Sequence, residues 1–321
     1  MIQLSALVLL VASVLPFCSA WGYLGHTTIA YVATNFVTDP TKTYFQNVLN
    51  DNSENYLAGV ATWADSYRYT DEGAFSEPFH YIDAIDSPPS SCGVDLVRDC
   101  NDDGCIVSAI ANYVRIVTYR SPMYELISSK TARVQDKTLS LADRTIAAKF
   151  LIHITIPNLA LKFNAHPSTQ FTGDIHQPLH VENLEVGGND IAVLFNNNAT
   201  NLHAAWDTEI PEKLIGGYTP ALAESWASKL TARIENGSLS HESLSWLVDT
   251  SLQDPEETAL SWARETNSFV CTIVLPDGQE ALEGKEISGA YYESAIPIVE
   301  KQIAKAGFRL AAWLNLIASS A

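Results

Sequence analysis

Val299–Ile317 reads VEKQIAKAGFRLAAWLNLI and lies close to the C-terminal end of the 321-residue chain. Its apolar residues recur three or four positions apart, at Val299, Ile303, Ala306, Leu310, Trp313 and Ile317. This spacing lines one face of an α-helix, and three basic residues stand beside that face: Lys301, Lys305 and Arg309. The stretch therefore predicts a long helix with one face buried.

Helical signals recur upstream, in the segments 106–117, 140–153, 220–234 and 254–257. Pro220 precedes a regular apolar repeat, and Asp254 followed by Pro255 is typical of a capped helix start. Alternating strand patterns are nearly absent, and Ile191–Phe195 is the best candidate for a short strand. The sequence therefore predicts an all-α fold, a single compact multi-helix domain.

The first 20 residues, MIQLSALVLLVASVLPFCSA, carry no charged side chain and end in the small residues Ser19 and Ala20. This pattern is typical of a secretory signal peptide. As a membrane anchor, the apolar run is short and lacks a basic flank. We expect cleavage after Ala20, a mature domain at 21–321 that begins with Trp21, and a secreted, extracellular protein.

Four of the five cysteines lie in the expected mature domain, and an even number in an exported chain indicates two disulfides. Cys100 and Cys105 enclose a short acidic segment and are expected to pair, which leaves Cys92 to pair with Cys271. The cysteine spacing disfavours a zinc ribbon. The chain also has two Asn-x-Ser/Thr sequences, which are predicted glycosylation sites: Asn198 and Asn236.

The chain is strongly acidic, with 37 Asp and Glu against 19 Lys and Arg and a net charge of −18. Nucleic-acid binders usually carry a basic face, because phosphate contacts supply much of their affinity. This sequence has no Lys/Arg cluster. If the protein acts on phosphodiesters, the positive charge is expected to come from bound metal ions.

Five of the eight histidines lie in short segments rich in Asp, Gly and Trp. These are WGYLGH (21–26), ATWADSYR (61–68) with FHYIDA (79–84), GDIHQPLH (173–180) and NLHAAWD (201–207). His203 and Asp207 lie four residues apart, so on a helix both side chains can reach one metal ion; alone, the pair could be a surface hydrogen bond. Together, imidazoles and carboxylates without a cysteine nucleophile or a Ser-His-Asp order favour zinc, and their number exceeds what one ion needs.

These segments, together with GGND (187–190), resemble the fungal secreted single-strand-specific zinc nucleases of the S1/P1 type. The likeness covers nearly the whole expected mature domain, including the cysteine positions. It implies a zinc phospholipase C-like helical fold, and both nuclease and 3′-nucleotidase activity. The implied substrates are single-stranded DNA, RNA and 3′-nucleotides, with no stable protein partner and no membrane.

The resemblance also implies a cofactor of three zinc ions. One would be bound by Asp65, His80, His153 and Asp174. A second would be bound by His180, His203 and Asp207. The third would be bound by His26, Asp174 and the α-amine and carbonyl of Trp21. Since an amide is a poor zinc ligand whereas an α-amine can lose its proton to the metal, a form extended before Trp21 is expected to lose the third zinc.

The mechanism that the resemblance implies is attack of a zinc-bound hydroxide on phosphorus, which leaves 5′-phosphorylated products. Asp65 would orient the hydroxide or accept its proton, and Arg68 would stabilise the pentacovalent phosphate. Asp83 would hydrogen-bond a base edge, Tyr81 would stack on the base and Val186 would pack against it. A stacked base must leave the duplex, which favours single strands. With the charge supplied by zinc, binding is expected to depend less on salt than in a basic groove.

The sequence departs from the family at 154–170. In the family, the histidine that matches His153 stands four residues before the aspartate that matches Asp174, whereas here ITIPNLALKFNAHPSTQ intervenes. Its two prolines forbid one continuous helix. Three interpretations stay open: the segment loops out and leaves His153 at the metal, His166 replaces His153, or the segment comes from a retained intron and is absent from the real protein.

Two other functions are compatible with the same ligands. A zinc phospholipase C would need an apolar rim that faces lipid, and Tyr81 with Asp83 instead favours a nucleobase. An inactive zinc-binding homologue becomes the better interpretation if the 154–170 insertion is real and disrupts the site.

Overall fold

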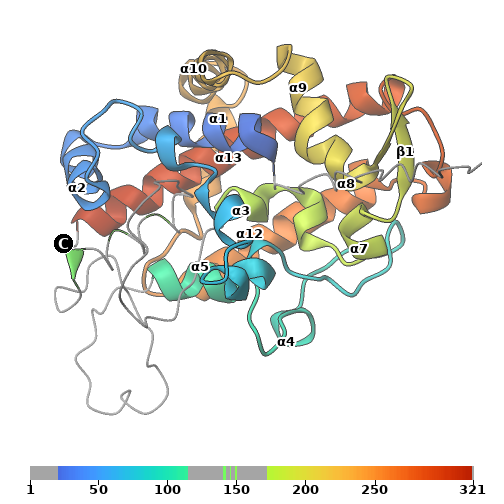
Figure 1. Cartoon of the computed structure of the whole chain (residues 1–321), viewed down its shortest axis with the longest axis horizontal. Helices are drawn as coiled ribbons and strands as arrows, with labels where there is room; N and C mark the ends of the chain where they lie inside the picture. The colour runs from blue at the N-terminus through green and yellow to red at the C-terminus, as the bar shows by residue number, and fades with distance from the viewer. Residues whose placement is uncertain (1–20, 115–139, 142–144, 146–148, 150–171, 320–321) are drawn as a thin grey trace, which may run out of the picture.

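The computed structural model describes residues 21–114, 140–141, 145, 149 and 172–319. The described chain is mostly helical, which confirms the predicted fold class (Figure 1). Its longer helices are α1 (Gly22–Phe36), α2 (Asp39–Leu49), α5 (Ile106–Val114), α10 (Pro220–Asn236), α12 (Pro255–Phe269) and α13 (Ala290–Ser319).

Shorter helical pieces connect these helices and carry much of the site. The α-helical pieces are α3 (Trp63–Tyr67), α4 (Leu96–Asp99), α7 (Glu185–Gly188), α8 (Leu202–Ala204), α9 (Ile210–Ile215) and α11 (Ser240–Ser243). The 3-10 turns are η1 (Ala58–Val60), η2 (Ala74–His80), η3 (Asp174–His176), η4 (Pro178–Val181), η6 (Leu244–Leu247) and η8 (Gln279–Ala281). Two π-helical turns follow α8 and α12: η5 (Ala205–Glu209) and η7 (Val270–Val274).

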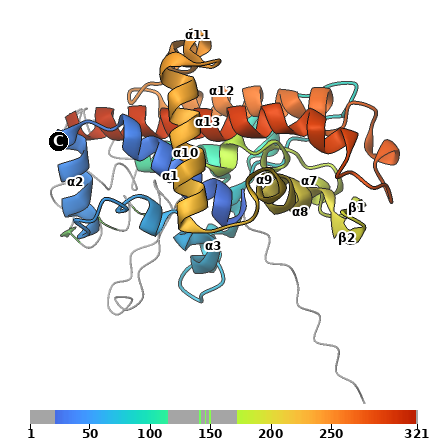
Figure 2. The ribbon, with the colours of Figure 1, turned by 90° about the horizontal axis from the view of Figure 1, so that it is seen from above.

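Helix α13 contains the stretch that predicted the fold, and all six residues of its apolar stripe are buried. It packs against α1, and α10 crosses both helices (Figure 2). The structure differs from the sequence in one respect: Lys305 and Arg309 are buried rather than merely beside the stripe. Both form ion pairs with Glu265 of α12, which offset part of the cost of burying the two cations.

The other helix predictions agree with the structure where it describes the chain. The hydroxyl of Thr219 caps α10, and the carboxylate of Asp254 caps α12 by accepting a hydrogen bond from the backbone N–H of Glu257. Helix α5 covers the first part of the predicted segment 106–117. Most of the segment 140–153 lies outside the described residues.

The predicted strand is half of a hairpin, and the described residues contain no strand besides this pair. Strand β1 (Ala192–Phe195) pairs antiparallel with β2 (Asn198–Asn201). Asn196 and Asn197 form the connection with φ of 51° and 62°, the left-handed conformations of a two-residue hairpin turn that Asn tolerates well. Asn198 and Asn236 are both exposed; their glycosylation stays a prediction.

Both predicted disulfides are present. Cys92 pairs with Cys271 across a sequence separation of 179 residues and joins the loop before α4 to η7. Cys100 pairs with Cys105 and closes the loop between α4 and α5. Among the described helices, none combines the length and the apolar character that crossing a bilayer requires. The segment 1–20 lies outside the described residues, so the signal peptide and the domain limits stay predictions.

Candidate metal centre

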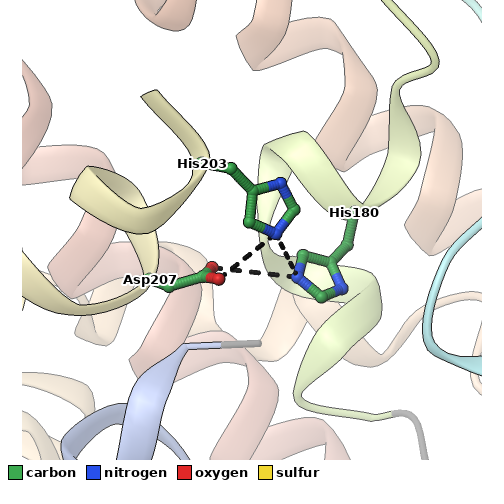
Figure 3. Close-up of side chains that lie close together, drawn as sticks. All are labelled: His180, His203 and Asp207. Atoms are coloured by element: carbon green, nitrogen blue, oxygen red, sulfur yellow. Dashed lines mark hydrogen bonds and ion pairs between the residues drawn. The ribbon is translucent and has the colours of Figure 1, made fainter. Parts of the chain in front are cut away.

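Three predicted ligands, His180, His203 and Asp207, converge in one buried group (Figure 3). The two histidine Nε2 atoms lie 3.1 Å apart. Asp207 Oδ2 lies 3.2 Å from Nε2 of His203, and Asp207 Oδ1 lies 3.7 Å from Nε2 of His180. One metal ion can therefore be reached by all three side chains.

Local backbone structure explains how these ligands meet. Pro178 interrupts the segment 173–180, so His180 lies on the short turn η4 rather than on a regular helix, as the proline predicted. The chain enters α8 with Asn201 as its cap, and its side-chain oxygen accepts a hydrogen bond from the backbone of Ala204. Helix α8 then widens into the π-turn η5. His203 and Asp207 still face the same side across this change of helix type.

The orientation of the two imidazole rings favours a cation between them. His180 Nδ1 lies 2.8 Å from the carbonyl oxygen of His80, and His203 Nδ1 lies 2.6 Å from the carbonyl oxygen of Gly187. Each Nδ1–H therefore donates to a carbonyl, so Nε2 is the nitrogen that each ring can offer to a metal. The two Nε2 atoms lie 3.1 Å apart. A divalent cation could be bound by both Nε2 atoms and by Asp207, so the donor set fits a metal.

Asp207 is held from the opposite side by Gln177, a residue that the sequence analysis did not single out. The Gln177 side chain donates from Nε2 to Asp207 Oδ1 at 2.6 Å, and its Oε1 accepts from the backbone N–H of Leu179 at 2.6 Å. Burial alone would raise the pKa of Asp207, but the neighbouring His203 and His180 outweigh it and hold that pKa well below its usual range. Asp207 is therefore oriented and kept ionised.

Four more predicted ligands form a second group around Asp174. His80 Nδ1 lies 3.0 Å from Asp174 Oδ2, and His26 Nε2 lies 3.3 Å from Asp174 Oδ1. Asp65 approaches both histidines, with oxygen-to-nitrogen distances of 3.7 Å to His80 and 3.9 Å to His26. All four residues are buried. Two carboxylates and two imidazoles at this spacing are ligands that zinc uses.

The electrostatics of Asp174 indicate that this group also needs a cation. Burial raises the pKa of Asp174 well above its usual value, the charge of Asp65 raises it further, and the charge of Arg68 lowers it. Oδ1 of Asp174 is buried and accepts no hydrogen bond from the described residues. Two carboxylates so close together are costly to bury ionised unless a metal offsets their charge.

Of the remaining predicted ligands, the structure describes Trp21 but not His153. Trp21 is fully buried at the start of α1, and its carbonyl accepts a hydrogen bond from the backbone N–H of Gly25. Gly173 is required beside this helix, because a Cβ there would lie 2.9 Å from Nδ1 of His26. His153, His166 and the segment 154–170 lie outside the described residues.

The predicted substrate residues lie at the edges of these groups. The backbone N–H of Ile82 donates to the carbonyl of His180, which places Tyr81 and Asp83 beside the predicted metal ligands. The Tyr81 hydroxyl donates to the Glu77 carboxylate at 3.0 Å. Burial raises the pKa of Asp83, and the negative charges of Glu77 and Asp99 raise it further.

Arg68 and Val186 occupy two other edges. Arg68 ends α3, one turn after Asp65, and its charge acts on both Asp174 and Tyr81. Val186 is 64% exposed and has a φ of 56°, which is strained for a β-branched residue. It directly precedes Gly187, whose carbonyl holds His203.

His176, although it lies within the GDIHQPLH segment, points away from the metal groups. Its Nδ1–H donates to the carbonyl of Thr172, and its Nε2 accepts a hydrogen bond from Arg309 at 2.9 Å. Gln302 donates to the backbone carbonyl of His176 at 2.9 Å. Helix α13 thus fixes the turn η3, which carries Asp174. Spacing in the sequence did not reveal this role.

The sequence matches the S1/P1 Nuclease family over residues 21–156 and 157–319. The chain belongs to the S1/P1 nuclease family. Membership in this family confirms the prediction that the chain is a nuclease, a hydrolase of phosphodiester bonds. The boundary between the two matched segments falls within 154–170, where the sequence analysis places the insertion.

Individual S1/P1 relatives align with almost the full length of the chain. Nuclease S1 of Aspergillus oryzae is 45% identical over 299 residues, which cover 93% of this chain and 92% of that protein. Nuclease P1 of Penicillium citrinum is 42% identical over 300 residues, with 94% and 98% covered. Endonuclease 4 of Arabidopsis thaliana is 30% identical over 328 residues, with 99% and 96% covered.

Proposed function

We propose that this S1/P1 nuclease is a zinc-dependent endonuclease of single-stranded DNA and RNA, and a 3′-nucleotidase, that leaves 5′-phosphorylated products. The observation that carries the proposal is the buried group of His180, His203 and Asp207, in which the two histidine Nε2 atoms lie 3.1 Å apart and one metal ion can be reached by all three side chains. The two histidines lie among buried carboxylates, in a chain of a nuclease family.

The ligand groups support three zinc sites. The first would use Asp65, His80 and Asp174, completed by His153. The second would use His180, His203 and Asp207. The third would use His26, Asp174 and Trp21. When bound, zinc would lower the pKa of a coordinated water to about 7 and offset negative charge on the phosphate oxygens.

The protein side chains would then position the substrate and move a proton. Asp65 is buried between His26 and His80, so its carboxylate can orient the attacking water and accept its proton. Arg68 reaches the same group from the end of α3, and its guanidinium can neutralise charge that develops on the phosphate.

A base subsite at Tyr81, Asp83 and Val186 would give the preference for single strands. Tyr81 offers an aromatic face, and Asp83 accepts hydrogen bonds from a base edge. Val186 is exposed and has a left-handed backbone conformation. A base can enter this subsite only when it is not paired in a duplex.

Secretion and processing would complete the third site. The family match begins at residue 21, which supports cleavage after Ala20. Cleavage would give Trp21 a free α-amine that can bind zinc. A form with extra residues before Trp21 should bind one zinc ion fewer, and a full complement of zinc in that form would argue against this site.

The experiment is a hydrolysis assay with the secreted protein on single-stranded DNA, double-stranded DNA and 3′-AMP, with and without a chelator. We expect rapid cleavage of the single strand, release of phosphate from 3′-AMP, and loss of both activities on zinc removal. Activity that survives complete zinc removal would overturn the proposal. Release of phosphocholine from lecithin in place of nucleotide cleavage would favour a phospholipase C.

A further inference from the structure

Two exposed tyrosines contact each other next to the metal centre. Tyr23 lies in the first turn of α1, and Tyr218 lies in the loop between α9 and α10. Their ring centroids are 5.8 Å apart with the planes tilted by 30°. Tyr23 is 54% exposed and Tyr218 is 37% exposed. The Tyr218 hydroxyl lies 3.4 Å from Oγ1 of Thr27, which holds the ring against α1.

The first turn of α1 fixes this tyrosine pair close to the ligands. Gly22 approaches Asp207 so closely that a Cβ at Gly22 would lie 3.0 Å from the Asp207 carbonyl oxygen. Figure 3 shows the start of α1 beside Asp207. Tyr23 follows Gly22 directly and precedes His26 by three residues, about one helical turn. The exposed rings therefore flank the metal centre.

The tyrosine pair and the base subsite adjoin two different histidines, His26 and His80, each of which meets a different oxygen of Asp174. His80 meets Oδ2 of Asp174 at 3.0 Å, and Tyr81 is the residue that follows His80. His26 meets Oδ1 of Asp174 at 3.3 Å, and Tyr23 lies one turn before His26. A strand that crosses the metal centre would thus have an aromatic surface available on each side of its scissile phosphate.

We propose that Tyr23 and Tyr218 form a second nucleobase platform, which binds the base across the scissile phosphate from the Tyr81 and Asp83 subsite. The inference rests on the proposed nuclease function. The net charge of −18 leaves little electrostatic attraction for the parts of a strand beyond the zinc ions. Stacking needs no positive charge, and it accepts every base because every base has an aromatic face.

The test compares a short single-stranded oligodeoxythymidylate, which can occupy both subsites, with 3′-AMP, which has only one base. Tyr23→Ala and Tyr218→Ala should raise the KM for the oligonucleotide relative to that for 3′-AMP by about 5- to 150-fold, since stacking contributes about 1–3 kcal/mol per base. Tyr23→Phe keeps the ring and should leave the ratio near that of the wild type. Leu244→Ala, an exposed apolar residue beyond the other end of α10, is the matched control.

A second measurement changes the substrate and uses only the Tyr23→Ala variant beside the wild type, because Tyr218→Ala can disturb its loop. The wild-type protein should bind an oligonucleotide with one abasic residue at the platform position as weakly as Tyr23→Ala binds the intact oligonucleotide. Combining Tyr23→Ala with the abasic oligonucleotide should weaken binding no further, because both changes remove the same stacking contact. Equal effects on both substrates, no effect on either, or a loss with Tyr23→Phe would each overturn the platform. If the wild-type protein hydrolyses neither substrate, the nuclease proposal fails and the platform fails with it.

Discussion

Gln177 donates a hydrogen bond to Asp207 over 2.6 Å, and both side chains are buried. The Gln177 side chain is itself fixed, because its Oε1 accepts from the backbone N–H of Leu179. Asp207 therefore has one oxygen occupied by a protein donor, while the other lies 3.2 Å from Nε2 of His203. This arrangement determines the rotamer of a predicted zinc ligand.

Gln177→Ala should consequently weaken zinc binding by about 10- to 100-fold, the usual effect of removing a residue that orients a metal ligand. The measurement is competition with a chromogenic chelator, and the activity should recover at high zinc concentration. Gln253→Ala, which alters an exposed glutamine in the loop before α12, is the control. Wild-type zinc affinity in Gln177→Ala would show that the hydrogen bond does not orient Asp207.

His203→Ala should remove one zinc ion per chain, because it leaves only His180 and Asp207 in that group. Hydrolysis of single-stranded DNA should fall by about 100-fold or more. Elemental analysis of the purified protein measures the loss directly. His241, an exposed histidine on α11, provides the matched control as His241→Ala. Unchanged zinc content in His203→Ala would contradict the second site.

Much of the fold, and several of the residues that the structure brings together, followed from the sequence because both depend on local patterns. The apolar stripe of α13 repeats at helical spacing, and Asp254 with Pro255 marks a helix start. The histidine and aspartate segments stood out by composition. Their meeting in space came from the resemblance to a family, since spacing along the chain does not show that Asp174 meets His26.

Supporting residues escaped prediction because their partners are far away in sequence. Arg309 is 133 residues from His176, and Lys305 is 40 residues from its partner Glu265. In the sequence, both cations resemble solvated residues at the edge of an amphipathic helix. Only the packing of α12 against α13 shows that they are buried. Likewise, the π-turn η5, which carries Asp207, has no recognised local signal in the sequence.

The two disulfides should differ in their contribution to stability. Cys92 and Cys271 are separated by 179 residues, and Cys100 and Cys105 by 5. A disulfide that closes a longer loop removes more chain entropy from the unfolded state. The resulting stabilisation is about 5 kcal/mol for Cys92–Cys271 and about 2 kcal/mol for Cys100–Cys105. The double variant Cys92→Ala, Cys271→Ala should therefore unfold at lower denaturant concentration than Cys100→Ala, Cys105→Ala. Equal midpoints in the two variants would contradict this order.

The ion pairs of Glu265 with Lys305 and Arg309 should be essential to the packing of α12 on α13. The two cations are 1% and 7% exposed at their side chains, and burial lowers the pKa of Lys305 to about 8. Glu265→Gln leaves both cations buried beside a neutral partner, so it should cost about 3 kcal/mol of unfolding free energy. Glu242→Gln, which breaks the more exposed pair with Lys301, should cost less than about 1 kcal/mol.

The pH dependence separates this ionic contribution from a packing defect. Burial raises the pKa of Glu265, but the charges of Arg309 and Lys305 outweigh it, and the net pKa lies below the usual 4.5. A carboxylate with a lowered pKa stabilises the folded state above its unfolded pKa and loses this effect as the pH falls through its folded pKa. The stability difference between wild type and Glu265→Gln should therefore shrink as the pH falls below about 4.5. A difference that persists at lower pH would mean that Glu265 acts through its shape rather than its charge.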